Sequence, residues 1–279
     1  MFRRPTYRLT LIFFVLLLNA CLTTPSLETR IEQAHMLASQ FGWQSLELNS
    51  EPYALRAFTP KQVVNTDILT VYIEGDGLAW TSRRRVSSNP TPANPIAFEL
   101  ALLDPNPSVY LARPCQYVQH THCDQALWTS ARFAETVIDS SNRAVDQLKQ
   151  RFAARRLRLI GYSGGAAIAA LLASRRTDVI QLVTVAGNLD HEVWTKHHRV
   201  SPLYQSLNPA DSWRSLVSIP QLHFIGEDDR NVGPFVVDAY LGHFPDGQKP
   251  PVHVVKNADH YCCWPEHWPS LLRMVYDSQ

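Results

Sequence analysis

The sequence predicts an α/β fold, in which a mostly parallel central sheet is flanked by helices. Short apolar segments at residues 68–73, 157–160 and 179–185 alternate with longer amphipathic segments. Parallel strands that are buried on both faces have this uninterrupted apolar character, and alternation of strand and helix is typical of parallel sheets. The length of 279 residues and the hydrophobic content of 45% suit one large domain with a substantial core.

Charge and composition exclude some classes of protein. The chain has 26 basic and 25 acidic residues and a formal net charge of +1, so it lacks a strong positive field that would attract nucleic acid. No internal repeat and no long low-complexity segment is visible. We therefore expect a globular protein with no nucleic-acid partner.

Residues 1–20 have the features of a secretory signal. Three arginines precede an apolar run at residues 9–18, which is too short to span a bilayer comfortably, and small residues then precede Cys21. The segment at residues 18–21, which ends in Cys21, resembles the lipobox of bacterial lipoproteins. The resemblance implies cleavage before Cys21, a lipid on its thiol and a membrane anchor in the cell envelope. Leu22, in place of aspartate, implies the outer membrane, facing the periplasm. A plain cleaved signal followed by an incidental cysteine is the alternative.

Residues 21–44 are expected to form a short polar tether and an amphipathic helix. Apolar residues recur at helical spacing within 27–41. The main domain is expected at residues 45–279, and it should open with two antiparallel strands at 46–48 and 53–58, separated by a short turn.

The remaining segments alternate between strand and helix patterns. The long helix predicted at 133–152 carries an apolar stripe. It ends in a basic cluster, which complements the negative end of a helix dipole. The further strands are expected at 68–73, 108–112, 157–160, 179–185, 221–225 and 252–255. The helices are expected at 96–103, 133–152 and 235–243, directly after the turn at 161–165, and from His267 onward.

The turn at residues 161–165 has the pattern G-x-S-x-G. In such a turn Ser163 would present its hydroxyl from a strained backbone conformation, which bulky neighbours would obstruct and glycines allow. The helix that follows would direct its positive N-terminal end at the serine. Ordinary glycine-rich turns also show this pattern, so the strand before it and the small residues after it carry the inference. We expect Ser163 to be a catalytic nucleophile.

An acidic residue that could orient a catalytic base follows the strand predicted at 221–225. Asp229 lies in the turn after that strand, and its neighbours Glu227 and Asp228 are competing candidates. Asp190, which follows the preceding strand, is a more distant candidate.

His260 lies in the loop just past the last predicted strand, from which a base would reach the serine. His253 lies inside that strand and His267 begins the closing helix, so both fit the role less well. The chain order Ser163, Asp229, His260 is that of α/β-hydrolases.

Residues from about 45 to 277 therefore resemble an α/β-hydrolase, and the spacing G-x-x-D-x-x-V around Asp229 resembles the acid turn of that superfamily. The resemblance implies an α/β-hydrolase fold with a small cap. It also implies a Ser-Asp-His triad that acts on a small-molecule or acylated substrate without a metal or an organic cofactor.

In α/β-hydrolases a loop after an early central strand supplies one N–H donor of the oxyanion hole. Here that loop contains Gly75 and Gly77, and the resemblance selects the N–H of Asp76, with the N–H of Gly164 as the second donor. Aspartate replaces the commoner apolar residue. Its carboxylate should therefore turn away from the oxyanion and cap its own loop. A plain glycine turn is the alternative.

A short insertion at 187–212 follows a central strand, where hydrolases often carry a cap. About 25 residues are too few for a large independent lid, so its aromatic residues either line a pocket or pack at the surface. The three consecutive arginines at 83–85 indicate a solvated face. The alternative is that one of them reaches an anionic group of the substrate.

The cysteines beyond Cys21 are even in number, as expected for disulfides in an oxidising compartment. Cys115 and Cys123 close a short loop and are the preferred pair. Cys262 and Cys263 are adjacent, and they either form a vicinal disulfide, stay reduced or pair with the other two.

The histidines at positions 120 and 122 give a weak metal-ligand pattern beside Cys123. No second ligand cluster with suitable spacing accompanies them in the sequence. We expect solvated histidines and no metal.

Three functions are compatible with these features. Hydrolysis of a carboxylic ester is the first, because a small cap leaves the site open to soluble esters. A peptidase or amidase would use the same triad. A non-catalytic envelope lipoprotein would use the fold for binding, although it would not need all three triad residues.

Overall fold

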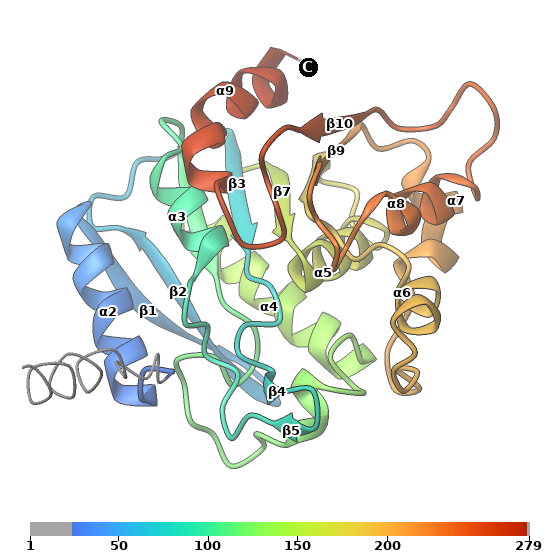
Figure 1. Cartoon of the computed structure of the whole chain (residues 1–279). Coiled ribbons are helices and arrows are strands. Elements are labelled where there is room, and N and C mark those ends of the chain that lie inside the picture. The colour runs from blue at the N-terminus through green and yellow to red at the C-terminus, as the bar shows by residue number, and fades with distance from the viewer. Residues whose placement is uncertain (1–23, 278–279) are drawn as a thin grey trace, which may run out of the picture.

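The structure is a computed structural model and describes residues 24–277. The predicted signal segment and Cys21 lie outside these residues. In the described range, eight strands form one sheet in the order β1-β2-β6-β3-β7-β8-β9-β10, and two short strands form a hairpin (Figure 1). The strands of the sheet are β1 (Trp43–Ser50), β2 (Tyr53–Pro60), β3 (Ile68–Ile73), β6 (Ser108–Leu111), β7 (Arg156–Tyr162), β8 (Val179–Val185), β9 (Gln221–Gly226) and β10 (Val252–Val255). The hairpin consists of β4 (Trp80–Ser82) and β5 (Arg85–Val86).

Helices connect most of these strands. They are α2 (Leu27–Gln40), α3 (Ile96–Leu102), α4 (Glu135–Arg151), α5 (Gly164–Ala173), α6 (His191–His198), α7 (Trp213–Leu216), α8 (Pro234–Leu241) and α9 (Trp264–Asp277), with 3-10 turns η1 (Gln125–Trp128) and η2 (Pro209–Ser212). None of the helices in residues 24–277 combines the length and the apolarity that crossing a bilayer requires.

The sheet is mostly parallel, as the sequence predicts. Neighbouring strands from β6 to β10 pair in parallel, whereas β1 with β2 and β2 with β6 pair antiparallel. At the centre, Ile73 at the end of β3 lies opposite Leu111 of β6 and Gly161 of β7. The carboxyl ends of the parallel strands therefore meet at one edge, where the loops that follow them converge.

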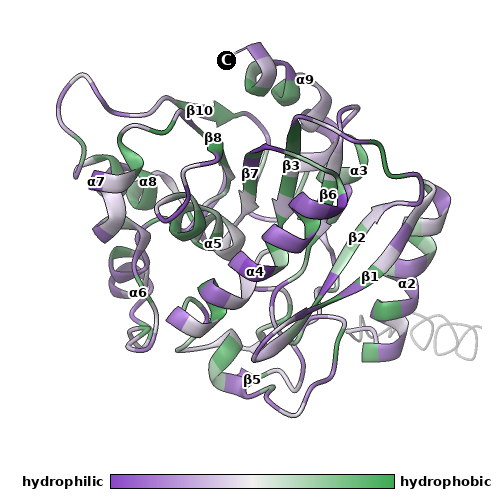
Figure 2. Cartoon of the chain, turned by 180° about the vertical axis from the view of Figure 1, so that it is seen from behind, coloured by the Kyte–Doolittle hydropathy of each residue, from purple (hydrophilic) through white to green (hydrophobic). Residues whose placement is uncertain are grey.

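Two apolar layers lie on opposite faces of the sheet. Alternate residues of a strand point to opposite faces, so Val71 packs with α4 and α5, whereas Tyr72 packs with α3 and α9. Figure 1 shows α2, α3 and α9 in front of the sheet, and Figure 2 shows α4 and α5 on the other side. Residues on both faces are fully buried, which explains why the central strands read as continuous apolar runs.

The predicted boundaries agree with the structure to within a few residues, and the differences lie at the closing helix, in a hairpin and in several short helical segments that the sequence does not predict. The closing helix begins at Trp264, ahead of the predicted start at His267. The hairpin β4–β5 has no counterpart among the predicted strands, because its strands are three and two residues long and have no buried face. Within the short insertion at 187–212 the structure contains α6 and η2.

Candidate active site

Ser163 occupies the sharp turn between β7 and α5. Its backbone has φ 51° and ψ −119°, a strained conformation for a residue other than glycine. A Cβ atom at Gly161 would lie 2.4 Å from the Cα atom of Ala166, and one at Gly165 would lie 2.2 Å from the carbonyl oxygen of Ile73. Real side chains do not fit at these distances, so both flanking glycines are sterically required.

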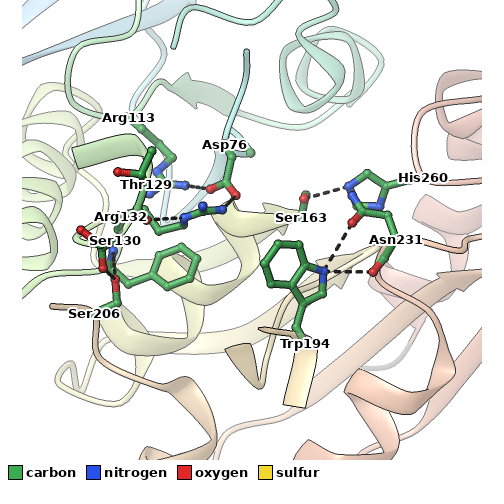
Figure 3. Close-up of polar contacts among 12 residues, drawn as sticks. Asp76, Arg113, Thr129, Ser130, Arg132, Ser163, Trp194, Ser206, Asn231 and His260 are labelled. Carbon is green, nitrogen blue, oxygen red and sulfur yellow. Dashed lines mark hydrogen bonds and ion pairs between the residues drawn. The ribbon is translucent and has the colours of Figure 1, made fainter. Parts of the chain in front are cut away.

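Ser163, His260 and Asp229 form one chain of hydrogen bonds. The hydroxyl of Ser163 lies 2.9 Å from Nε2 of His260, as Figure 3 shows, and Nδ1 of His260 lies 2.8 Å from Oδ2 of Asp229. Oδ1 of Asp229 accepts the N–H groups of Asn231 and Val232, each at 2.8 Å. Because an ionised carboxylate only accepts, Nδ1 carries the proton and Nε2 is left to accept from the serine.

The competing acids and bases have other surroundings. Glu227 and Asp228 are exposed to solvent, whereas the side chain of Asp229 is fully buried. Asp190 caps the N-terminus of α6, where its carboxylate accepts two backbone N–H groups. His253 lies within β10, and His267 lies in the first turn of α9. The structure thus brings together the three residues that the chain order selects.

The loop that carries His260 is held against the ends of β7 and β9. The hydroxyl of Tyr162 donates a hydrogen bond of 2.7 Å to the carbonyl oxygen of His260, and the indole N–H of Trp264 also reaches that oxygen, at 3.3 Å. A Cβ atom at Gly226 would lie 2.5 Å from the carbonyl oxygen of Ala258. Because Gly226 lacks a side chain, the loop that carries His260 can pack directly against the turn that carries Asp229.

The loop after β3 lies directly beside the serine. A Cβ atom at Gly75 would be 3.3 Å from Cβ of Ser163, and Gly77 has φ +61° with a proline carbonyl oxygen 2.0 Å from the position of its missing Cβ. A Cβ atom at Gly164 would lie 2.1 Å from Oδ1 of Asp76, so these two segments touch. Among the described residues, the N–H groups of Asp76 and Gly164 donate no hydrogen bond. Both donors are therefore free to bind a ligand.

The side chain of Asp76 does not cap its own loop, so that expectation is wrong. It forms ion pairs with Arg113 and Arg132, which come from the segments after β6 and after η1 (Figure 3). Burial alone would raise the pKa of this carboxyl, but the charges of Arg132 and Arg113 outweigh burial and hold the pKa below its usual value. The two guanidinium groups thus neutralise a carboxylate that would otherwise repel a neighbouring oxyanion.

Glu74 is a buried carboxyl at the end of β3. Its Oε1 accepts the N–H of Gly75 at 2.8 Å, and its Oε2 has no hydrogen-bond partner among the described residues. Burial raises its pKa to about 7. No sequence pattern singles out Glu74, because the groups that surround it, such as Tyr110 and Ala97, are distant in the chain.

A pocket of about 360 Å³ opens beside Ser163 and His260. Trp80 and Tyr261 stand at its rim with relative exposures of 44% and 66%. Its other lining residues are Glu74, Asp76, Gly77, Leu78, Ala79, Pro92, Ala93, Asn94, Arg132, Tyr162, Trp194 and Asn231. The wall is therefore partly apolar, with a few charged groups close to the serine.

The insertion and the arginine run contribute differently to this pocket. Within residues 187–212 only Trp194 lines it, and its indole N–H donates a 3.0 Å hydrogen bond to the carbonyl oxygen of Asn231 (Figure 3). The arginines at 83–85 are solvent-exposed and do not line the pocket, as a solvated face predicts. The arginine in the pocket wall is Arg132, which the sequence pattern does not single out.

The structure has two disulfides in its described part. Cys115 pairs with Cys123, and Cys262 pairs with its neighbour Cys263, two residues after His260. The histidines at 120 and 122 lie at the surface with their Nδ1 atoms 3.2 Å apart. No group of three or more His, Cys, Asp or Glu side chains within residues 24–277 is arranged to hold a metal.

At the level of sequence, no protein family and no curated protein matches the chain. Solved structures do resemble it. An α/β serine hydrolase homologue from Coxiella burnetii is 16% identical, with a TM-score of 0.56 over 84% of this chain and 96% of the other. An esterase from Pyrococcus furiosus is 14% identical, with a TM-score of 0.59 over 86% and 92%. A proline iminopeptidase from Mycobacterium smegmatis is 14% identical, with a TM-score of 0.57 over 84% and 96%. The chain therefore has the α/β-hydrolase fold.

Proposed function

We propose that the protein is a serine hydrolase that cleaves a carboxylic ester through an acyl-enzyme. One observation carries the proposal: Ser163, His260 and Asp229 are joined by hydrogen bonds of 2.9 and 2.8 Å at the base of a pocket. A nucleophile, a base and a group that orients the base need this arrangement, and a binding protein does not.

In the first step, Nε2 of His260 takes the proton of the Ser163 hydroxyl as its oxygen attacks the acyl carbonyl. Asp229 accepts a hydrogen bond from Nδ1, which fixes the tautomer and stabilises the imidazolium that forms. The proton then passes from His260 to the leaving alcohol. Water attacks the acyl group in the second step, with His260 again as the base.

The free N–H groups of Gly164 and Asp76 hold the oxyanion in both steps. One such donor typically contributes about 3 kcal/mol to stabilisation of the transition state. The N-terminus of α5 points at the same place and adds its partial positive charge. Two arginines form ion pairs with the Asp76 carboxylate and compensate its negative charge. The backbone N–H of Asp76 can therefore bind an oxyanion although its side chain is acidic.

An ester is favoured over an amide because the pocket is open and the segment 187–212 adds only one of its lining residues, Trp194. Amide cleavage by the same residues is the second candidate, and the likeness to a proline iminopeptidase is the observation that favours it. The two are separated by comparing kcat/KM for p-nitrophenyl esters of graded chain length with that for the matching p-nitroanilides.

The test of the nucleophile is labelling with a fluorophosphonate probe. Purified wild-type protein should be labelled, and Ser163→Ala should not, while both give the same far-UV circular dichroism. Absence of labelling in folded wild type, or equal labelling of the variant, would contradict the assignment.

We also propose that the mature chain is a lipoprotein of the bacterial envelope, anchored through Cys21 at the outer membrane and facing the periplasm. The lipobox-like sequence before Cys21 supports this. The paired cysteines at 115 and 123 are compatible with an oxidising compartment. In bacteria that produce the protein, Cys21→Ser should abolish incorporation of an alkyne-tagged palmitate and release the protein from the membrane fraction. Incorporation that persists in the variant would refute the anchor.

A further inference from the structure

Arg132 places a guanidinium group in the wall of the active-site pocket. The residue is 5% exposed, yet it lines the pocket beside Asp76 and Ser163. Figure 3 shows its guanidinium next to the Asp76 carboxylate. A charge that is this deeply buried needs hydrogen-bond or ion-pair partners.

The nitrogens of Arg132 are only partly satisfied. Nη1 binds Asp76, and Nε donates a 2.8 Å hydrogen bond to the carbonyl oxygen of Thr129. Nη2 makes no hydrogen bond with a described residue, although only 7% of the side chain is exposed. The ring of Trp194, which also lines the pocket, lies 5.9 Å from the guanidinium carbon.

Arg113 provides a contrast within the same cluster. Its Nη1 also binds Asp76, but its Nη2 donates to the carbonyl oxygen of Arg132, and the residue does not line the pocket. Both terminal nitrogens of Arg113 are therefore engaged inside the protein. Of these two arginines, Arg132 borders the pocket, and its Nη2 is the terminal nitrogen without a hydrogen-bond partner among the described residues.

The cluster also keeps a net positive charge. One carboxylate, that of Asp76, faces two guanidinium groups, so one positive charge is uncompensated within the three residues while the neighbouring Glu74 is protonated, which its pKa of about 7 allows below that pH. In a site partly shielded from water, such a charge attracts an anionic oxygen more strongly than it would at the surface. The carboxylate and phosphate groups that match the geometry of a guanidinium are the natural occupants.

We propose that Nη2 of Arg132 binds a carboxylate or phosphate group of the substrate, so that the enzyme selects anionic esters. This inference rests on the proposed function, since it names the substrate class of that site. It places substrate recognition at Arg132, in the pocket wall, and not at the exposed arginines at 83–85.

The test compares matched substrates on the purified full-length chain. For an anion on the acyl side, the pair is the p-nitrophenyl monoester of glutaric acid and p-nitrophenyl pentanoate. For an anion on the alcohol side, the pair is 4-acetoxybenzoate and 4-acetoxybenzamide. The ratio of kcat/KM for the anionic to the neutral member is measured in each variant, so differences in intrinsic reactivity cancel between variants.

Arg132→Met should lower this ratio by about 10- to 100-fold in one of the two pairs, because a charge-assisted hydrogen bond is lost. The pair that responds identifies the part of the substrate that carries the anion. Arg132→Lys should recover part of the ratio. Arg113→Met is the matched control: it also removes one partner of Asp76, so it should slow both members of a pair alike and leave the ratio unchanged.

A measurement of anion binding by an inactive variant makes the test independent of turnover. Glutarate or inorganic phosphate should raise the melting temperature of Ser163→Ala, and the rise should disappear in the double variant Ser163→Ala/Arg132→Met. A ratio that Arg132→Met changes by less than twofold in both pairs, together with an unchanged response to both anions, would overturn the proposal. That result would leave the proposed function intact, whereas failure of fluorophosphonate labelling would contradict the proposed function itself.

Discussion

Replacement of Glu74 by glutamine tests how far burial controls a charge beneath the active site. Glu74 is 1% exposed; its Oε1 accepts the N–H of Gly75, and its Oε2 has no hydrogen-bond partner within residues 24–277. Glutamine keeps that acceptor and the shape of the side chain but cannot ionise. The variant therefore isolates the cost of the buried negative charge.

The magnitude follows from the shift in pKa. Burial raises the pKa of Glu74 from 4.5 to about 7 in the folded protein, so folding favours the protonated form. At about 1.4 kcal/mol for each pH unit between the two values, the difference is about 3 kcal/mol. Its stabilising contribution is fully present below pH 4.5 and is lost as the pH rises to about 7.

His223 acts in the opposite direction and must be separated from Glu74. Burial lowers the pKa of this histidine from 6.5 to about 3, so its contribution to stability is present above pH 6.5 and is lost as the pH falls toward 3. Because His223 is present in wild type and in Glu74→Gln alike, its effect cancels when the two free energies of unfolding are subtracted.

The assay is urea unfolding of wild type and Glu74→Gln at several pH values between 4 and 8, with the disulfides intact. The stability of the variant relative to wild type should increase by about 3 kcal/mol across this range. Glu32→Gln, an exposed replacement on α2, is the matched control and should follow wild type at every pH. A difference between Glu74→Gln and wild type that stays constant with pH would refute the reasoning.

Three further outcomes are expected. Gly165→Ala should lower the free energy of unfolding in urea by about 3 kcal/mol, because its Cβ would lie 2.2 Å from a backbone oxygen; Gly247→Ala, at φ +83° but with open space around it, should cost about 1 kcal/mol, and equal costs would contradict the steric argument. Asp229→Asn should lower kcat on p-nitrophenyl esters by up to about 10⁴-fold with an unchanged melting temperature, and a loss below tenfold would exclude its orienting role. Replacing both Cys115 and Cys123 by alanine should destabilise the fold by about 2–3 kcal/mol in the same urea assay, because the cross-link spans a loop with a sequence separation of 8; an unchanged midpoint would show that the loop is ordered without it.

Sequence patterns alone predict the features that depend on local geometry. Strand and helix patterns reflect the periods at which side chains point to one face, so the mostly parallel sheet follows from them. The turn at Ser163 is only partly local: a Cβ atom at Gly161 is excluded by Gly165 and Ala166 of the following helix, whereas one at Gly165 is excluded by the backbone of Ile73 in β3. The order of Ser163, Asp229 and His260 also selected three residues that the structure brings within hydrogen-bond distance.

The environment of the charged groups depends on how distant segments of the chain pack together. Asp76 meets Arg113 and Arg132, which are 37 and 56 residues away, because β6 pairs with β3 and brings the following loop beside it. Glu74 is buried by the same convergence of segments. An ion pair between distant loops has no period and no spacing in the sequence, so a pattern cannot reveal it. Strand order, which depends on global packing, determines which loops meet and hence which charges line the pocket.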